Sequence, residues 1–122
     1  MRVLLVDDAP EVRGQLRRLL SRDEAVERVF ESGEVEEGLG KARELAPDLV
    51  VADLQLGASE SDGLELIRKL KREELGSSVV VFSNHPELEE YALTAGADAF
   101  FDKSDGVEGL LEFVRSVAGP AP

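Results

Sequence analysis

The sequence has no cysteine, one histidine and no long apolar run. Without cysteine, neither a disulfide framework nor a thiolate metal site can form. A membrane helix needs about 20 consecutive apolar residues, and no apolar run of the chain approaches that length. The chain passes from Met1 and Arg2 directly into a short apolar run, without the h-region of a signal peptide. These absences lead us to expect a soluble cytoplasmic protein that makes no membrane contact.

Basic residues are also scarce, since 14 Lys and Arg stand against 26 Asp and Glu and the formal net charge is −12. Nucleic acids and anionic membranes bind basic surfaces, so we expect no direct contact with nucleic acid. The excess of acids suits a cationic partner or a bound metal ion, although solubility alone explains most of them. A length of 122 residues, 43% of them hydrophobic, is enough for one domain with a core.

Short apolar runs alternate with segments of helical periodicity five times along the chain. The runs expected to form strands are residues 2–6, 25–32, 48–54, 78–83 and 98–101. The segments expected to form helices are 10–21, 34–46, 62–75, 86–97 and 106–118. This alternation predicts an α/β fold of the doubly wound (βα)5 type, with a five-stranded parallel sheet and helices on both faces. We expect the domain to span residues 1–118, followed by a tail or the start of a linker at 119–122.

Polar residues with related chemistry follow the carboxyl ends of the expected strands. They are Asp7 and Asp8 after the first, Asp53 in the third, Ser83 at the end of the fourth and Lys103 after the fifth. In a parallel sheet these ends share one edge, which is where ligands bind. Adjacent carboxylates repel one another, and a hard divalent cation such as Mg²⁺ removes that repulsion. The edge is therefore expected to hold Mg²⁺ and to support phosphoryl transfer to a carboxylate. Taken alone, Asp7 and Asp8 could instead cap the following helix.

Four segments carry a resemblance to a known family: LLVDD near the start, VVADL in mid-chain, and then VVVFSN and ADAFFDKS. Over residues 2 to 118 the chain resembles the receiver domain of bacterial response regulators. The resemblance implies a flavodoxin-like fold with strand order 2-1-3-4-5. It also implies that Asp53 receives a phosphoryl group from a histidine kinase or a phosphotransfer protein. Ser83 and Lys103 would then contact that group.

The resemblance further implies a set of metal ligands. Asp8 and Asp53 would bind Mg²⁺ directly, together with the backbone carbonyl of Gln55. Asp7 would act mainly through a bound water. Each of these assignments follows from matching positions in the family pattern.

A switch is implied in the same way. Ser83 would move toward the phosphoryl group and Phe100 would turn inward, which changes the face formed by residues 86–97, 98–101 and 106–118. From their positions alone, we expect Gln55 and Asn84 to tune the rate of dephosphorylation. We expect His85 to be an exposed loop residue rather than a ligand or a base.

Three features depart from the family pattern. Gly57 stands where proline is usual and the next glycine is Gly63, so the loop after the phosphoacceptor is longer. Ser104 replaces a proline that commonly follows the lysine, so the lysine loop is expected to be held differently. Asn84 replaces a small residue.

The leading hypothesis is a phosphorylation-controlled binding module that catalyses its own phosphorylation and dephosphorylation and is not an enzyme with an external substrate. Its switched face would bind a downstream protein partner, an output domain outside this sequence, or a second copy in a homodimer. One alternative is a pseudo-receiver, a constitutive interaction domain that is not phosphorylated. A Mg²⁺-dependent phosphatase acting on small molecules is a distant third, because Gln55 stands where such enzymes usually carry a second aspartate.

Overall fold

The structure is a computed structural model that describes residues 1–56 and 61–119. Within this part of the chain, strands and helices alternate as the sequence predicts. The strands are β1 (Arg2–Val6), β2 (Arg28–Ser32), β3 (Leu49–Ala52), β4 (Ser78–Ser83) and β5 (Ala99–Asp102). The helices are α1 (Pro10–Ser21), α2 (Val35–Leu45), α3 (Ser61–Arg72), α4 (Glu89–Ala95) and α5 (Glu108–Ala118), with short 3₁₀ turns η1 (Pro86–Leu88) and η2 (Lys103–Asp105).

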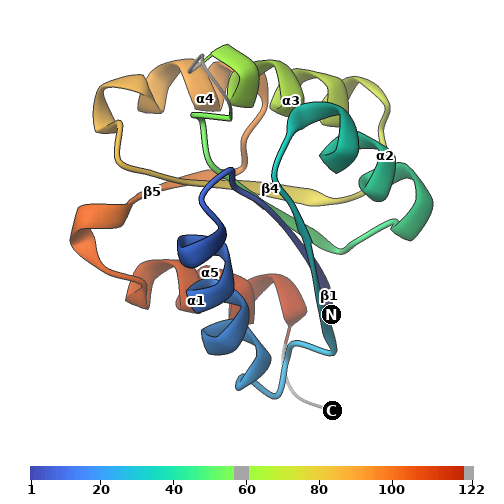
Figure 1. Ribbon diagram of the computed structural model, residues 1–122, viewed down its shortest axis with the longest axis vertical. Helices are drawn as coiled ribbons and strands as arrows, with labels where there is room; N and C mark the ends of the chain where they lie inside the picture. Colours follow the sequence, from blue (N-terminus) through green and yellow to red (C-terminus); the bar gives the residue numbers. More distant parts are fainter. Residues whose placement is uncertain (57–60, 120–122) are drawn as a thin grey trace.

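All neighbouring strands are parallel, and their order across the sheet is β2-β1-β3-β4-β5. This confirms the predicted doubly wound α/β fold and its strand order. Figure 1 shows α2, α3 and α4 on one side of the sheet and α1 and α5 on the other. The strand order reverses between β1 and β3, and ligands bind beyond the carboxyl ends of the strands at such a point.

Alternate residues of the central strands build two separate cores. On β1, Leu4 and Val6 pack in the core beneath α2, α3 and α4, whereas Val3 and Leu5 pack in the core beneath α1 and α5. The residues of β3 alternate in the same way and are at most 3% exposed. Because these strands are buried on both faces, their sequences are continuously apolar.

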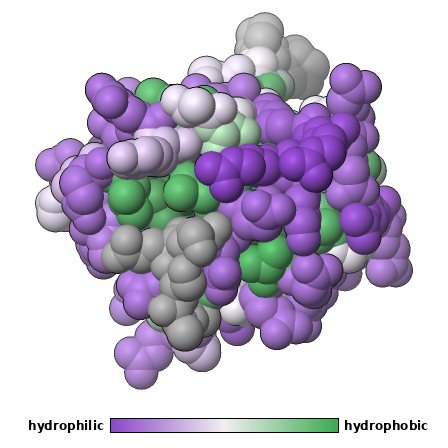
Figure 2. Space-filling view, turned by 90° about the horizontal axis from the view of Figure 1, so that it is seen from above, coloured by the Kyte–Doolittle hydropathy of each residue, from purple (hydrophilic) through white to green (hydrophobic). Residues whose placement is uncertain are grey.

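The outer surface is mostly polar. Figure 2 views the layer of α2, α3 and α4 and shows hydrophilic residues over most of it. Among the described residues, the exposed large hydrophobic side chains are Tyr91 and Leu93, both on α4. In residues 1–56 and 61–119, no helix has both the length and the apolar character needed to cross a membrane.

Several element boundaries differ from the prediction for local reasons. The helix expected over 86–97 is divided into η1 and α4, and the helix expected over 62–75 ends at Arg72. Close to that end, Glu74 has a positive φ of 51°. The helix expected over 34–46 ends at Leu45, and Ala46 is exposed and left-handed, with a φ of 45°. The following Pro47 explains why the helix does not continue through Ala46, since proline disfavours the right-handed helical conformation in the residue before it.

Candidate functional site

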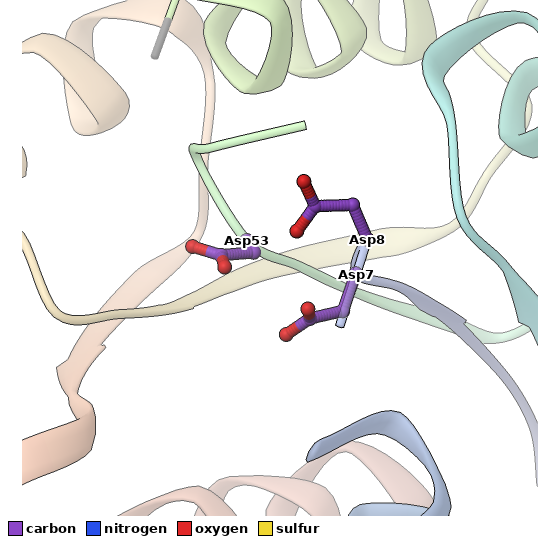
Figure 3. A group of neighbouring side chains, drawn as sticks. All are labelled: Asp7, Asp8 and Asp53. Atoms are coloured by element: carbon purple, nitrogen blue, oxygen red, sulfur yellow. The ribbon is translucent and has the colours of Figure 1, made fainter. Parts of the chain in front are cut away.

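Three carboxylates meet at the carboxyl edge of the sheet. Val6 and Ala52 are paired on the adjacent strands β1 and β3, so Asp7 and Asp53 follow at the same level. The Asp53 N–H group donates to the Val6 carbonyl at 2.9 Å, which extends the pairing to the acid itself. One carboxylate oxygen from each of Asp7, Asp8 and Asp53 lies within 4.8 Å of the other two. Figure 3 shows the three carboxylates together at the ends of β1 and β3, turned in the same direction.

Strand alternation decides what surrounds each acid. Asp7 and Asp53 continue the alternation of Val3, Leu5 and Val51, so they lie toward the α1 and α5 side of the sheet. They are 4% and 9% exposed. Asp8 is exposed. The site therefore combines two carboxylates held among apolar neighbours with one that faces solvent.

Lys103 reaches the two buried acids from η2. Its Nζ donates to Asp7 Oδ2 at 3.0 Å and to Asp53 Oδ2 at 3.1 Å. The ammonium also lies 5.9 Å from the centroid of the Phe82 ring, on the same side of the sheet. Only 13% of the Lys103 side chain is exposed, so these contacts form in a poorly solvated space.

The environment shifts two pKa values. Burial raises the pKa of Asp7, and this effect exceeds the stabilisation of its anion by the Ala9 N–H group and by Lys103. Burial opposes the charged form of Lys103, but attraction to Asp53 and Asp7 outweighs it and raises the pKa of the ammonium. An ionised Asp7 beside an ionised Asp53 is thus costly and would be stabilised by additional positive charge.

The donor set fits a hard divalent cation. Three carboxylates and one ammonium leave an excess of negative charge, and carboxylate oxygens are the ligands that Mg²⁺ prefers. The competing interpretation of the acids as helix caps is not supported, because the N-cap of α1 is Ala9 and no side chain caps it. Asp7 Oδ1 does accept from the Ala9 N–H group, at 2.8 Å, which orients the carboxylate. Ligation by the Gln55 carbonyl stays a prediction.

The two expected switch residues lie on β4 and β5. Ser83 is fully buried, and its hydroxyl accepts from the His85 N–H group at 3.1 Å. Phe100 is half-buried on the side of α2, α3 and α4, and Phe101 is half-buried on the opposite side, 6.0 Å from the Phe113 ring. Phe100 also lines a hollow of about 230 Å³ together with Glu89. Movement of Ser83 and Phe100 stays a prediction.

A comparison with protein families decides the relationship. The family model of the response regulator receiver domain matches residues 3–115. The chain belongs to this family. Every residue of the site described above lies within the matched range of this receiver domain.

Known proteins agree with this assignment. The nitrate/nitrite response regulator protein NarL of Escherichia coli K12 is 36% identical over 118 residues, which are 95% of this chain and 54% of NarL. A two-component response regulator of the LuxR family from Aurantimonas superposes with a TM-score of 0.85 at 32% identity, covering 97% of this chain and 85% of the other. The response regulator TrrA from Thermotoga maritima, solved in complex with Mg²⁺ and BeF, shares the fold with a TM-score of 0.84 at 24% identity, covering 95% of this chain and 97% of the other. The chain spans about half the length of the curated relatives it matches.

In this receiver domain, polar side chains that follow β3 and β4 contact one another. His85 Nε2 lies 3.3 Å from Gln55 Oε1, and His85 Nδ1 lies 3.2 Å from Glu87 Oε1. His85 was expected to be exposed, but its side chain is 26% exposed because it lies between these two partners. Asn84 is exposed. An effect of Gln55 or Asn84 on dephosphorylation stays a prediction.

The lysine loop of this receiver domain is held by a side-chain cap. Asp102 Oδ1 accepts from the N–H and hydroxyl groups of Ser104, at 2.9 and 2.8 Å. A proline at position 104 could not donate the first of these bonds. With serine at position 104, this cap anchors the residues around Lys103; whether relatives with proline hold the loop differently stays a prediction.

Gly63 is a site residue whose role the sequence did not reveal. A Cβ atom there would lie 2.3 Å from Leu54 Cα and 2.5 Å from the Asp53 carbonyl oxygen. The Gly63 N–H group donates to the Leu54 carbonyl at 3.0 Å. Helix α3 thus rests directly on the backbone of the expected phosphoacceptor. The rest of the loop, including Gly57 and the expected lengthening, lies in residues 57–60, outside the described residues.

Proposed function

We propose that the chain is a phosphorylation-controlled receiver in which Asp53 accepts a phosphoryl group from a histidine kinase or a phosphotransfer protein. The observation that supports it is the convergence of Asp7, Asp8 and Asp53 within 4.8 Å, with Lys103 in contact with the first and the last. A lone buried carboxylate at a strand end would be costly. Three carboxylates beside a lysine are explained if the site binds a cation and a phosphoryl group, because the cation offsets the negative charge.

The transfer step follows from the position of Asp53. One of its carboxylate oxygens attacks the phosphorus of the donor's phosphohistidine, and an O–P bond forms as the P–N bond breaks. The imidazole of the donor leaves with the electron pair of that bond and takes up a proton. The product is an acyl phosphate on Asp53. No base is needed on this chain, since an ionised carboxylate is already a nucleophile.

Positive charge and hydrogen bonds would stabilise the transferred group. When bound by Asp8 and Asp53, Mg²⁺ would neutralise charge on the phosphoryl oxygens. Lys103 Nζ is 3.1 Å from Asp53 Oδ2, so it lies within reach of a group attached to this carboxylate. The Ser83 hydroxyl can donate its own proton to a phosphoryl oxygen while it accepts from another group.

Signal output is proposed to occur at the face formed by α4, β5 and α5. Ser83 pairs with Asp102 across β4 and β5, so a displacement of Ser83 would be transmitted to β5, the strand that carries Phe100. A rotation of Phe100 would change the hollow that it lines beside Glu89. The changed face would then bind a protein partner, an output domain or a second copy. Slow loss of the phosphoryl group, tuned by Gln55 and Asn84, would reset the switch.

The test is phosphorylation by a small phosphodonor, followed by intact-mass measurement. With Mg²⁺, the wild-type protein should gain the mass of one phosphoryl group, and addition of EDTA should prevent the gain. Asp53→Asn should gain nothing, and peptide mapping should place the group on Asp53. A wild-type protein that stays unmodified with both donor and Mg²⁺ would refute the proposal and favour a pseudo-receiver. Multiple turnover of an external phosphate ester would favour a phosphatase.

A further inference from the structure

Arg13 makes a partly buried contact with the backbone of the acidic site. Arg13 is on α1, and its Nη1 donates to the Asp7 carbonyl oxygen at 2.7 Å. Its Nε donates to Glu31 Oε1 at 3.1 Å, at the end of β2. The Arg13 side chain is 20% exposed. The guanidinium thus links the backbone between the two acids to the neighbouring strand.

We propose that Arg13 is a positioning residue for the cation, which acts by fixing the peptide plane between Asp7 and Asp8. The Asp7 carbonyl and the Asp8 N–H group belong to one planar unit, so a guanidinium that holds the carbonyl also sets the direction in which Asp8 leaves the strand. In the preceding peptide unit, the Asp7 N–H group donates to the Ser32 carbonyl at 3.0 Å. This inference rests on the proposed function, because it assumes that Asp8 binds Mg²⁺.

Gly33 and Glu31 surround the Arg13 guanidinium and favour its contact with the Asp7 carbonyl. A Cβ atom at Gly33 would lie 3.0 Å from Arg13 Nη1, so a side chain at that position would press on the guanidinium. Glu31 Oε1 pairs with Arg13 Nε, and its second oxygen, Oε2, pairs with Arg17 Nε, each at 3.1 Å. The Arg13 guanidinium is therefore oriented by Glu31 through Nε and by the Asp7 carbonyl through Nη1.

Arg17 provides a matched control. Arg13 and Arg17 lie on the same helix, carry the same charge and pair with the same carboxylate of Glu31. Only Arg13, of these two, donates to the Asp7 carbonyl. Arg17 is more exposed, at 51% of its side chain. A comparison of Arg13→Gln with Arg17→Gln therefore isolates the backbone contact from the loss of one positive charge and one ion pair.

The sign of the effect separates positioning from simple electrostatics. Removing a positive charge beside an acidic site should strengthen cation binding if charge alone matters. Loss of an outer contact that orients metal ligands should weaken it, by about tenfold or more. Arg13→Gln is therefore expected to bind Mg²⁺ about tenfold more weakly than the wild type, whereas Arg17→Gln should stay within about twofold.

The experiment is a Mg²⁺ titration of the whole chain. Calorimetry measures the affinity, and nuclear magnetic resonance monitors the amide resonance of Asp8. Arg13→Gln should also shift the Asp8 amide resonance before Mg²⁺ is added, and Arg17→Gln should not. Thermal melts of the two variants check that both fold. Equal or tighter Mg²⁺ binding by Arg13→Gln, or equal weakening in both variants, would overturn the inference. A wild-type protein that binds no Mg²⁺ would instead refute the proposed function, which keeps the two failures distinct.

Discussion

Gly63 allows the sharpest prediction from packing, because its substitution by alanine should have the opposite effect to that usual in a helix. Alanine within a helix is normally more stable than glycine by about 1 kcal/mol. At Gly63, however, the added Cβ would lie 2.3 Å from Leu54 Cα, whereas ordinary contacts begin at 3.4 Å. The backbone of α3 and that of Leu54 would have to separate by about 1 Å. The neighbouring atoms are backbone and cannot rotate away.

The expected size follows from the cost of overpacking, which reaches about 3 kcal/mol in a well-packed interior. With about 2 cal/mol/K of unfolding entropy per residue, a chain of 122 residues should lose about 12 °C in its thermal midpoint. A shift of about 1 Å at the backbone next to Asp53 should also slow phosphorylation, by up to about 100-fold. Thermal melting monitored by circular dichroism measures the loss of stability. The time course of intact mass after phosphodonor treatment measures the rate of phosphorylation.

Gly40 is the control for Gly63. It lies within α2, and a Cβ atom there would meet nothing within 4 Å. Gly40→Ala should raise the thermal midpoint by about 4 °C through helix propensity and leave phosphorylation unchanged. A Gly63→Ala protein as stable as the wild type, with normal phosphorylation, would show that α3 does not rest on the backbone of Asp53, the proposed phosphoacceptor, as described.

Three further predictions concern the charged groups of the site. Asp7→Asn should stabilise the magnesium-free protein at pH 7, because burial raises the pKa of Asp7 and the ionised carboxylate opposes folding. Because its pKa is raised, Asp7 makes the wild type less stable as the pH rises through the pKa of the folded state. The stability gained by Asp7→Asn should therefore vanish below pH 3.8, the ordinary value of the carboxyl. A variant less stable than the wild type at pH 7 would contradict the argument. Lys103→Met should raise the pKa of Asp7 further, since the charge and hydrogen bond of Lys103 lower it; an unchanged carbon-13 titration of the carboxyl would disprove this. Asp102→Ala should cost about 1 kcal/mol in urea unfolding through loss of the cap on the lysine loop, and Ser104→Ala should cost less because the backbone bond remains; equal losses would argue against that bond.

The arrangement of strands and helices could be predicted from the sequence because each kind of element has its own pattern of apolar residues. Buried parallel strands are continuously apolar, as in residues 3–6 and 49–52, and the helices between them repeat with a period of 3.6. The meeting of Asp7, Asp8 and Asp53 followed from the same reasoning, since parallel strands end at one edge. Helix ends were less predictable, because the division between η1 and α4 depends on local backbone geometry.

Contacts between distant loops could not be obtained in this way. The ends of β3 and β4 bring Gln55 and His85 to one edge of the sheet, but no periodic pattern predicts that their side chains meet. The same holds for the contact of Arg13 with the Asp7 carbonyl, because a backbone acceptor leaves no trace in the sequence. Gly63 was noted as a departure from the family spacing, but its close approach to Leu54 appears only in three dimensions.

A crystal structure of the chain grown with Mg²⁺ and beryllofluoride, a phosphoryl mimic, would test the central claim most directly. We predict one Mg²⁺ ion in contact with carboxylate oxygens of Asp8 and Asp53, beryllofluoride on Asp53, and Lys103 Nζ in contact with the mimic. An ion bound away from these carboxylates, or beryllofluoride attached to another residue, would contradict the account.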